Sequence, residues 1–323
     1  MIIRRMPPSC IAAGCMAILA FLWSLSLQCA AGGRPVALGV TLDGLPLSPA
    51  RLATVATELG RPPAIVTFFL AWPEVATQDM APFPRETLDA IGASGAIPCL
   101  TWEPMVIRDG KESTVPAERI LDGTYDPYLR RFAREARAWK TPLIIRFAHE
   151  MNLERYHWGT ERSAYGPESP GLYRAIFHHV VQCFRMDGAL NVAWAFCPNS
   201  ESIPDIRKAP WNSAGNYYPG DTWVDIMGMD GYNWGTTQTQ ATNGWTSTWR
   251  EFPDIFGSLH AELRRMAPKK PLVVFETSSV TEGGIRRGWL QTALRAASTW
   301  GLDAMCVFHV QKEQDWRIQA QDL

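Results

Sequence analysis

The sequence predicts one closed barrel of eight β/α units, an α/β fold of the (β/α)8 or TIM-barrel type. From Val36 onward, short apolar runs alternate with longer amphipathic stretches, which is the pattern of β/α units. The runs are nearly continuous in apolar or β-branched residues, as parallel strands buried on both faces require. No low-complexity linker interrupts this alternation, so we expect a single domain over residues 34–323.

Eight apolar runs are expected to form the strands, and a barrel of about 250 residues fits within the 323 residues of the chain. The expected strands are Val36–Val40, Ala64–Phe69, Ala96–Leu100, Leu143–Phe147, Asn191–Phe196, Val224–Met229, Leu272–Phe275 and Ala304–Phe308. The clearest helices between them are expected at Ser48–Gly60, Tyr125–Lys140, Glu251–Met266 and Ile285–Trp300. An open doubly wound sheet is the main alternative, but no glycine-rich phosphate turn follows the first run.

Composition excludes some classes of function. The chain has 31 basic and 32 acidic residues, so it carries no excess of positive charge and nucleic acid is not an expected partner. Four of the seven cysteines follow the N-terminal segment, they form no CxxC pair, and three lie in apolar runs. We therefore expect them to be buried free thiols rather than a disulfide framework.

The N-terminal segment has the arrangement of a signal peptide. Arg4 and Arg5 precede an apolar stretch from Cys10 to Leu27, and small residues such as Ala31 follow it. We expect a signal peptide over residues 1–31 and a secreted or periplasmic mature protein. The alternative is an uncleaved signal anchor, because the stretch is near the minimum of ~17 residues that spans a bilayer. Contact with a membrane is expected only in that case.

Two glutamates stand directly after expected strands, where catalytic side chains of a β/α barrel lie. Glu150 follows the fourth strand, and Glu276 follows the seventh on the opposite wall. Cleavage of a glycosidic bond uses two carboxyl groups, and a retaining mechanism needs them about 5 to 5.5 Å apart. The pair therefore indicates a glycosidase, although a glutamate at a strand end is often only a surface charge.

The residues around Glu150 also resemble a known family. Arg146-Phe147-Ala148-His149-Glu150-Met151-Asn152, followed by Tyr156-His157-Trp158, is similar to the strand-four signature of glycoside hydrolase family 26. That family includes β-mannanases and mixed-linkage β-glucanases, which are retaining clan A glycosidases. Supporting similarity occurs at Thr101–Pro104, Trp194–Asn199, Asp225–Asn233 and Phe275–Glu276.

This resemblance implies a retaining, endo-acting β-glycoside hydrolase that needs no cofactor or metal. It implies that Glu150 is the general acid/base and Glu276 the nucleophile, that Tyr232 donates its hydroxyl to Glu276, and that His149 touches the sugar next to the scissile bond. The substrate would be a β-mannan, a mixed-linkage β-glucan or a bacterial exopolysaccharide. We expect the enzyme to be a monomer.

Strand alternation adds further candidates for the site. Arg146 shares a barrel face with Glu150 and is expected either to stabilise Glu276 or to form a structural ion pair, while Asp230 shares a face with Tyr232. Asn152 is the last residue of the family-like run. Tryptophans that follow expected strands are candidate sugar platforms, with Trp316 assigned to the reacting sugar. They are Trp72, Trp102, Trp158, Trp234 and Trp316.

Arg155 stands where the family has a tryptophan, and it could favour a substrate that carries carboxylate groups. A metallohydrolase is not expected, because Leu153 occupies the position of the second histidine of HExxH. The principal functional alternative is a carbohydrate-binding barrel that holds a glycan without cutting it.

Overall fold

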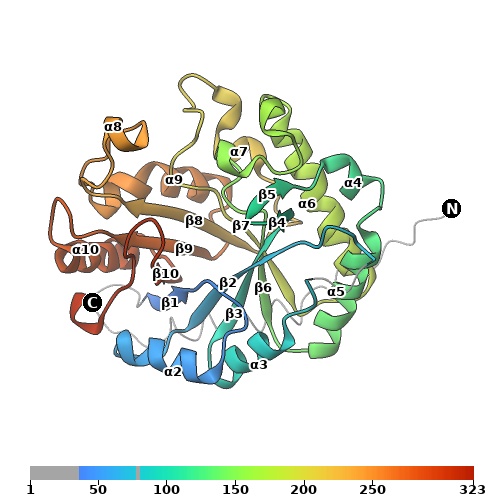
Figure 1. The fold of residues 1–323 in the computed structure, drawn as a ribbon, viewed down its shortest axis with the longest axis horizontal. Helices are drawn as coiled ribbons and strands as arrows, with labels where there is room; N and C mark the ends of the chain where they lie inside the picture. The colour runs from blue at the N-terminus through green and yellow to red at the C-terminus, as the bar shows by residue number, and fades with distance from the viewer. Residues whose placement is uncertain (1–35, 78–80) are drawn as a thin grey trace.

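The computed structural model describes residues 36–77 and 81–323, so the predicted signal peptide over residues 1–31 lies outside the described residues. Eight parallel strands close into a barrel in the order β1-β10-β9-β8-β7-β6-β3-β2, which confirms the predicted fold. The strands lie at the centre of the molecule and helices surround them (Figure 1). Within the described residues, no helix has the length and apolar character needed to cross a membrane.

The barrel strands include all eight predicted runs. They are β1 (Ala37–Thr41), β2 (Ile65–Ala71), β3 (Ile97–Glu103), β6 (Leu143–Phe147), β7 (Val192–Phe196), β8 (Ile226–Asn233), β9 (Leu272–Ser279) and β10 (Ala304–Phe308). Five of them extend beyond their predicted ends. Strands β1 and β2 continue by one and two residues, and β3, β8 and β9 continue because ladder pairing runs through Glu103, Asn233 and Ser279. The predicted ends were therefore too early, and the polar residues that follow the apolar runs are held in regular strand geometry.

The helices follow the strands in the alternation expected of the fold. They are α2 (Pro49–Glu58), α3 (Arg85–Ala93), α4 (Ala117–Leu121), α5 (Asp126–Trp139), α6 (Ser169–Met186), α7 (Ala214–Tyr217), α8 (Gln240–Asn243), α9 (Phe252–Met266) and α10 (Arg286–Thr299). Ser48 caps α2 at its N-terminus, since the Ser48 side chain accepts a hydrogen bond from the Arg51 amide. After β7 the short α7 replaces a long helix, and after β10 the chain forms only the 3-10 turn Ala320–Asp322.

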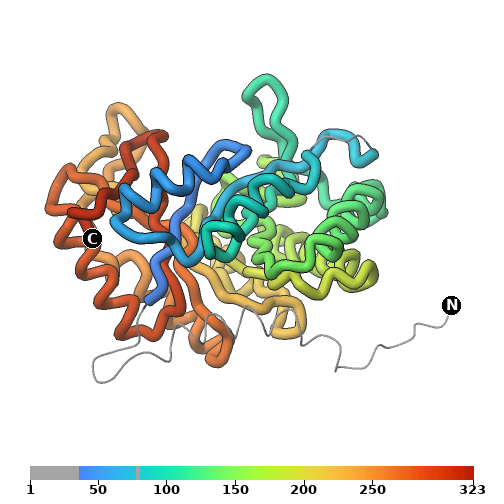
Figure 2. The backbone as a smooth tube through the Cα atoms, turned by 90° about the horizontal axis from the view of Figure 1, so that it is seen from below, coloured from blue at the N-terminus to red at the C-terminus, as the bar shows by residue number. Residues whose placement is uncertain are grey.

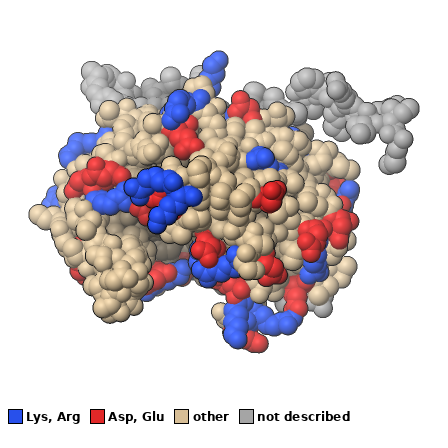
Figure 3. Space-filling model, turned by 90° about the horizontal axis from the view of Figure 1, so that it is seen from above, with Lys and Arg blue, Asp and Glu red and all other residues tan. Residues whose placement is uncertain are grey.

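A two-stranded hairpin is inserted after β3. It consists of β4 (Met105–Arg108) and β5 (Lys111–Thr114), paired antiparallel. In Figure 2 the segment that carries it projects from the body of the molecule. Basic and acidic side chains are interspersed over the face drawn in Figure 3, which is consistent with the small net charge of the chain.

The core has two layers. The inner layer fills the barrel with small and branched side chains, including those of Cys99, Cys197 and Cys306, which are free thiols. This interior is close-packed: a Cβ added at Gly39 would lie 2.4 Å from the Cys306 sulfur. The outer layer lies between the barrel and the helices and contains many aromatic rings. These layers hold the strand ends rigidly, and polar residues project from those ends.

Candidate active site

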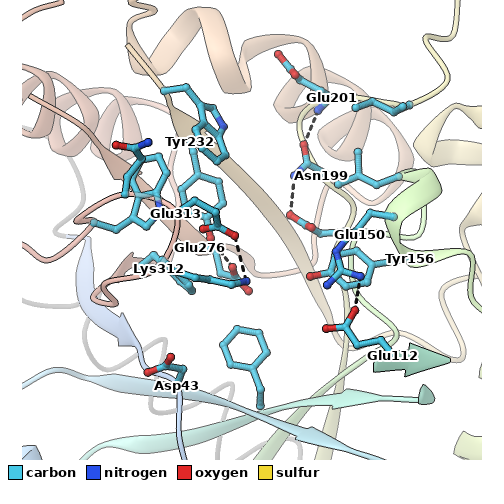
Figure 4. Close-up of a pocket in the computed structure, with 18 of the residues that line it drawn as sticks. Asp43, Glu112, Glu150, Tyr156, Asn199, Glu201, Tyr232, Glu276, Lys312 and Glu313 are labelled. Atoms are coloured by element: carbon cyan, nitrogen blue, oxygen red, sulfur yellow. Dashed lines mark hydrogen bonds and ion pairs between the residues drawn. The ribbon is translucent and has the colours of Figure 1, made fainter. Parts of the chain in front are cut away.

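A cavity of about 930 Å³ lies at the carboxyl ends of the barrel strands. Residues from β3, β8, β9 and β10 line it, together with the segment after β6, the β4–β5 hairpin and the loop that contains α8. Figure 4 shows Glu150 beside Asn199 and Tyr156 on one side, and Glu276 beside Tyr232 and Lys312 on the other. The structure thus brings the two predicted carboxyl groups into one cavity.

Glu150 is positioned by an unusual backbone. Ala148 and Glu150 have φ values of 49° and 51°, in the left-handed region that non-glycine residues rarely adopt. The turn is secured because the Glu150 amide donates to the Cys197 carbonyl at 2.8 Å, and the Asn199 side chain donates to the Glu150 carboxylate at 2.6 Å. Only 7% of Glu150 is exposed.

The surroundings of Glu150 raise its pKa to about 7. Burial is the largest cause, since it disfavours the charged carboxylate, and the negative charge of Glu276 adds to it. The hydrogen bond from Asn199 and the charge of Arg146 act in the opposite direction. A carboxyl group with this pKa exchanges a proton near neutral pH, as a general acid that later acts as a base must do.

Glu276 is positioned by an irregularity in β9. The register with β8 pairs Met229 with Val274 but Asp230 with Glu276, so Phe275 is an extra residue at a β-bulge. The bulge changes the face to which the following residue points, and Glu276, 5% exposed, lines the cavity. The sequence offers no signal for this bulge.

Arg146 binds two acids at the floor of the site. Its guanidinium group donates to Glu276 and, at 2.5 Å, to Asp230, and the Thr101 hydroxyl accepts from it at 2.7 Å. Arg146 and Asp230 are completely buried, so the charges are compensated within the protein. The sequence left two roles open for Arg146, and the structure shows both contacts: Arg146 pairs with Glu276 and also forms a buried ion pair with Asp230.

Tyr232 contacts the other oxygen of Glu276, to which its hydroxyl donates a hydrogen bond. Burial raises the pKa of this phenol well above its usual range, so Tyr232 stays a neutral donor. The Tyr232 ring lies 5.0 Å from the ring of Trp316, which also lines the cavity. Glu276 thus has a hydrogen-bond donor on each of its oxygens.

His149 and Asn152 do not belong to the wall of this cavity in the described structure. The His149 ring packs 4.7 Å from that of Tyr156, and burial lowers the pKa of the imidazole well below its usual value. Asn152 accepts from the Asn199 amide at 2.8 Å and donates to the Asn199 carbonyl at 2.9 Å. Asn152 therefore holds in place the residue that donates to Glu150. The predicted sugar contact of His149 stays a prediction.

Three of the expected sugar platforms are wrong. Trp72 and Trp102 belong to the hydrophobic core, where their rings lie 5.1 Å apart, and neither lines the cavity. Trp158 is also buried, and its indole donates to the His149 carbonyl. The reason is strand alternation: Thr101 points into the barrel to meet Arg146, so Trp102 points outward toward the helices.

The structure adds residues that the sequence did not single out as site residues. Trp245, in the loop after β8, is 43% exposed, lines the cavity and lies edge-on to Trp234 at 5.7 Å. Tyr156 and Glu103 also line it. Trp245 follows no strand and gave no signal, whereas Glu103 could have been found from alternation, because it lies two residues beyond Thr101 on the same face.

Arg155 lines the cavity but is not free to bind an acidic ligand. It forms an ion pair with Glu112 of β5, and its guanidinium group lies 4.8 Å from the centre of the Tyr156 ring. The hydrogen bond from Arg155 lowers the pKa of Glu112. The other basic residue of the wall, Lys312, lies 3.4 Å from Glu313. The further acids of the wall are Asp43, Glu103, Glu112, Glu201 and Glu313.

Two clusters in the described residues have the geometry of metal ligands. In the first, His149, Asp230 and Glu276 lie close together, but Arg146 already compensates both carboxylates. The second cluster joins α5 to α6 away from the cavity, where His179 and Asp126 are 2.7 Å apart and Cys183 is nearby. The first cluster thus has its charge balanced by Arg146, and the second lies apart from the pair of glutamates.

Comparisons with known proteins find glycosidases. A model of glycosyl hydrolase family 26 matches residues 120–291. Endoglucanase H of Acetivibrio thermocellus is 33% identical over 263 residues, which cover 81% of this chain and 26% of that protein. A mannan endo-1,4-beta-mannosidase of Bacillus subtilis is 25% identical over 131 residues, covering 38% of this chain and 30% of that protein.

Solved structures show the same fold. Bacillus subtilis mannanase man26 superimposes with a TM-score of 0.66 at 16% identity, covering 96% of this chain and 89% of that chain. A GH26 beta-mannanase from Bacteroides ovatus gives a TM-score of 0.62 at 19% identity, covering 94% and 88%. At these identities the likeness concerns the fold alone. The chain spans about a quarter of the length of Endoglucanase H.

Proposed function

Because this chain belongs to glycosyl hydrolase family 26, we propose that it is an endo-acting, retaining β-glycosidase that cleaves a neutral polysaccharide. The observation that carries the proposal is the unlike environment of two acids in one cavity. Glu276 is bound by Arg146 and Tyr232, which stabilise its negative charge, while burial and that same charge keep Glu150 protonated up to about pH 7.

The proposed reaction is a double displacement. Glu150 protonates the glycosidic oxygen while Glu276 attacks the anomeric carbon, so that the leaving sugar departs and a glycosyl ester forms. Esterification removes the charge of Glu276, which is one cause of the raised pKa of Glu150. The pKa of Glu150 then falls, and its carboxylate can take a proton from the water that hydrolyses the ester.

A neutral substrate is favoured by the charges of the cavity wall. Its acids outnumber its bases, and Arg155 and Lys312 already face acidic partners. A polymer rich in carboxylates would meet repulsion there. Endoglucanase H and the mannosidases suggest β-glucan and β-mannan as the first polymers to test. Arg155 is thus proposed to shape the cleft through Glu112 rather than to select acidic sugars.

Uncharged surface at one end of the cavity also supports a neutral polymer. The segment 234–249 contains no Asp, Glu, Lys or Arg, and it places Trp234, Trp245, Gln238 and Asn243 on the cavity wall. Indole rings pack against the CH-rich faces of sugars, and amides bond to their hydroxyl groups. We include export in the proposal on the ground of the N-terminal signal-peptide pattern.

The experiment compares the wild type with Glu276→Ala and Glu150→Gln on β-mannan, mixed-linkage β-glucan and an acidic exopolysaccharide. We expect the wild type to release oligosaccharides from a neutral polymer with the β configuration retained, measured by NMR of fresh products. Both variants should lose at least ~10³-fold in kcat while they keep the thermal stability of the parent. An inverted product would exclude Glu276 as a nucleophile.

A non-catalytic barrel predicts a different result. In that case the wild type binds a glycan in calorimetry but releases no reducing ends from any polymer of the panel. Azide added to Glu276→Ala provides a second test, since it can enter the space left by the carboxylate and form a glycosyl azide of the opposite configuration. Such a product would identify Glu276 as the nucleophile.

A further inference from the structure

A third glutamate, Glu103, lies on the cavity wall and takes no part in the proposed double displacement. It is the last residue of β3, beside the strand β6 that leads to Glu150, and it is 6% exposed. Two ladder positions earlier, Thr101 bonds to Arg146, so the β3 face that carries Glu103 is the face that serves the active site.

Glu103 differs from the other acids of the wall because its carboxyl group has no hydrogen-bond or ion-pair partner within residues 36–77 and 81–323. Each of the others has one: Asp43 pairs with Arg51, Glu112 with Arg155, Glu150 with Asn199, Glu201 with Arg250, Glu276 with Arg146 and Glu313 with Lys312. The carboxyl group of Glu103 opens into the cavity, so water or a ligand can supply the partner that the protein does not.

Burial also determines the protonation state of Glu103. It raises the pKa of this carboxyl group to about 8, and the charges of Glu276 and Glu112 act in the same direction. Arg146 and Arg155 oppose them without cancelling the effect of burial. At neutral pH the group is therefore an uncharged acid, which offers one O–H donor and one carbonyl acceptor to a ligand.

We propose that Glu103 is a specificity-determining residue that binds hydroxyl groups of a neutral sugar on the side of the cavity formed by the β4–β5 hairpin. Vicinal hydroxyl groups of a hexose match a donor and an acceptor that lie side by side. This inference rests on the proposed function, which supplies a neutral polysaccharide.

The test uses Glu103→Gln, Glu103→Ala and the control Glu86→Ala, which removes an exposed glutamate from α3. The substrate is a mannohexaose or a mixed-linkage glucohexaose, chosen according to which of the two the wild type cleaves. We expect Glu103→Ala to raise KM about tenfold with kcat changed less than about threefold. Glu103→Gln keeps a donor and an acceptor, so its KM should stay within about threefold of the wild type.

Binding to the inactive Glu276→Ala background, measured by calorimetry, gives the second readout. Adding Glu103→Ala should weaken the hexaose about tenfold. Analogues that lack single hydroxyl groups should identify the hydroxyl group that Glu103 binds. In the protein that keeps Glu103, one deoxy sugar should bind more weakly than the parent hexaose. In the Glu103→Ala protein, the same deoxy sugar should bind as well as the parent hexaose. This non-additivity would not arise from a merely structural residue.

Three results would overturn the inference. They are an unchanged KM in Glu103→Ala, an equal rise of KM in Glu103→Gln and Glu103→Ala, or the absence of any deoxy sugar whose loss of binding affinity depends on Glu103. The failure of the proposed function is distinct, because in that case the wild type itself cleaves no polymer. Thermal denaturation of each variant checks folding, and Glu103→Gln is the variant that changes the side-chain volume least.

Discussion

The hydrogen bond from Asn199 to Glu150 should set the upper pH limit of activity. The Asn199 amide donates to the Glu150 carboxylate at 2.6 Å and lowers the pKa of a carboxyl group that burial raises to about 7. A hydrogen bond to a charged group contributes ~1.5–3 kcal/mol, and one to a neutral group about 1 kcal/mol less. Since 1.36 kcal/mol corresponds to one pKa unit, Asn199→Ala should raise the pKa of Glu150 by about one unit.

The sign of the effect on activity follows from the role of Glu150. A general acid works only while it is protonated, so kcat/KM falls as the pH rises through the pKa of Glu150 in the free enzyme. At pH 8 the wild type should retain about 10% of its plateau value and Asn199→Ala about half. Initial rates on a soluble β-glycan between pH 5 and pH 10 measure both limbs of the profile.

The matched control is Asn216→Ala, which removes an exposed asparagine of α7 whose side chain donates only to residues 210–213 just before it. It should leave the alkaline limb where the wild type has it. An alkaline limb of Asn199→Ala that stays in place, or that moves to lower pH, would refute the reasoning. A lower plateau of kcat/KM with an unchanged alkaline limb would mean that Asn199 positions the Glu150 side chain but does not lower its pKa.

Three further predictions concern other parts of the molecule. Trp245→Ala should raise KM about two- to tenfold on long oligosaccharides and leave short ones unaffected, as steady-state kinetics on a length series would show. Trp102→Ala should cost ~3–5 kcal/mol in urea denaturation, because Trp102 is core, and a selective KM effect with full stability would contradict its burial. Glu103 keeps a proton in the folded state up to about pH 8, whereas the unfolded chain releases it near the ordinary glutamate pKa of 4.5, so its contribution to stability falls as the pH rises. Glu103→Gln should therefore stabilise the protein by up to about 3.5 kcal/mol more at pH 8 than at pH 5, and equal gains at both values would contradict the pKa shift.

Local sequence patterns were sufficient for the elements of the barrel. Strands buried on both faces need continuous apolar residues, and Leu143–Phe147 and Ala304–Phe308 were predicted with the bounds that the structure has. Strand ends were predicted less well where pairing continues through polar residues, as in β3 and β9. The apolar pattern stops at those places, but the hydrogen-bonded ladder does not.

The sequence by itself determined the fold class and the two glutamates, because barrel strands and their first polar residues are local features of the chain. Only the tertiary structure decided how those residues are used. The bulge at Phe275 turns the Glu276 side chain toward the cavity, and Asn199, which lies far from Glu150 in the chain, lowers the pKa of Glu150. Glu112, in the inserted β4–β5 hairpin, forms an ion pair with Arg155. Burial and partnership are properties of neighbours that lie far apart in the chain, and for that reason the ion pair of Arg155 with Glu112 and the hydrogen bond from Asn199 to Glu150 became visible only in the structure.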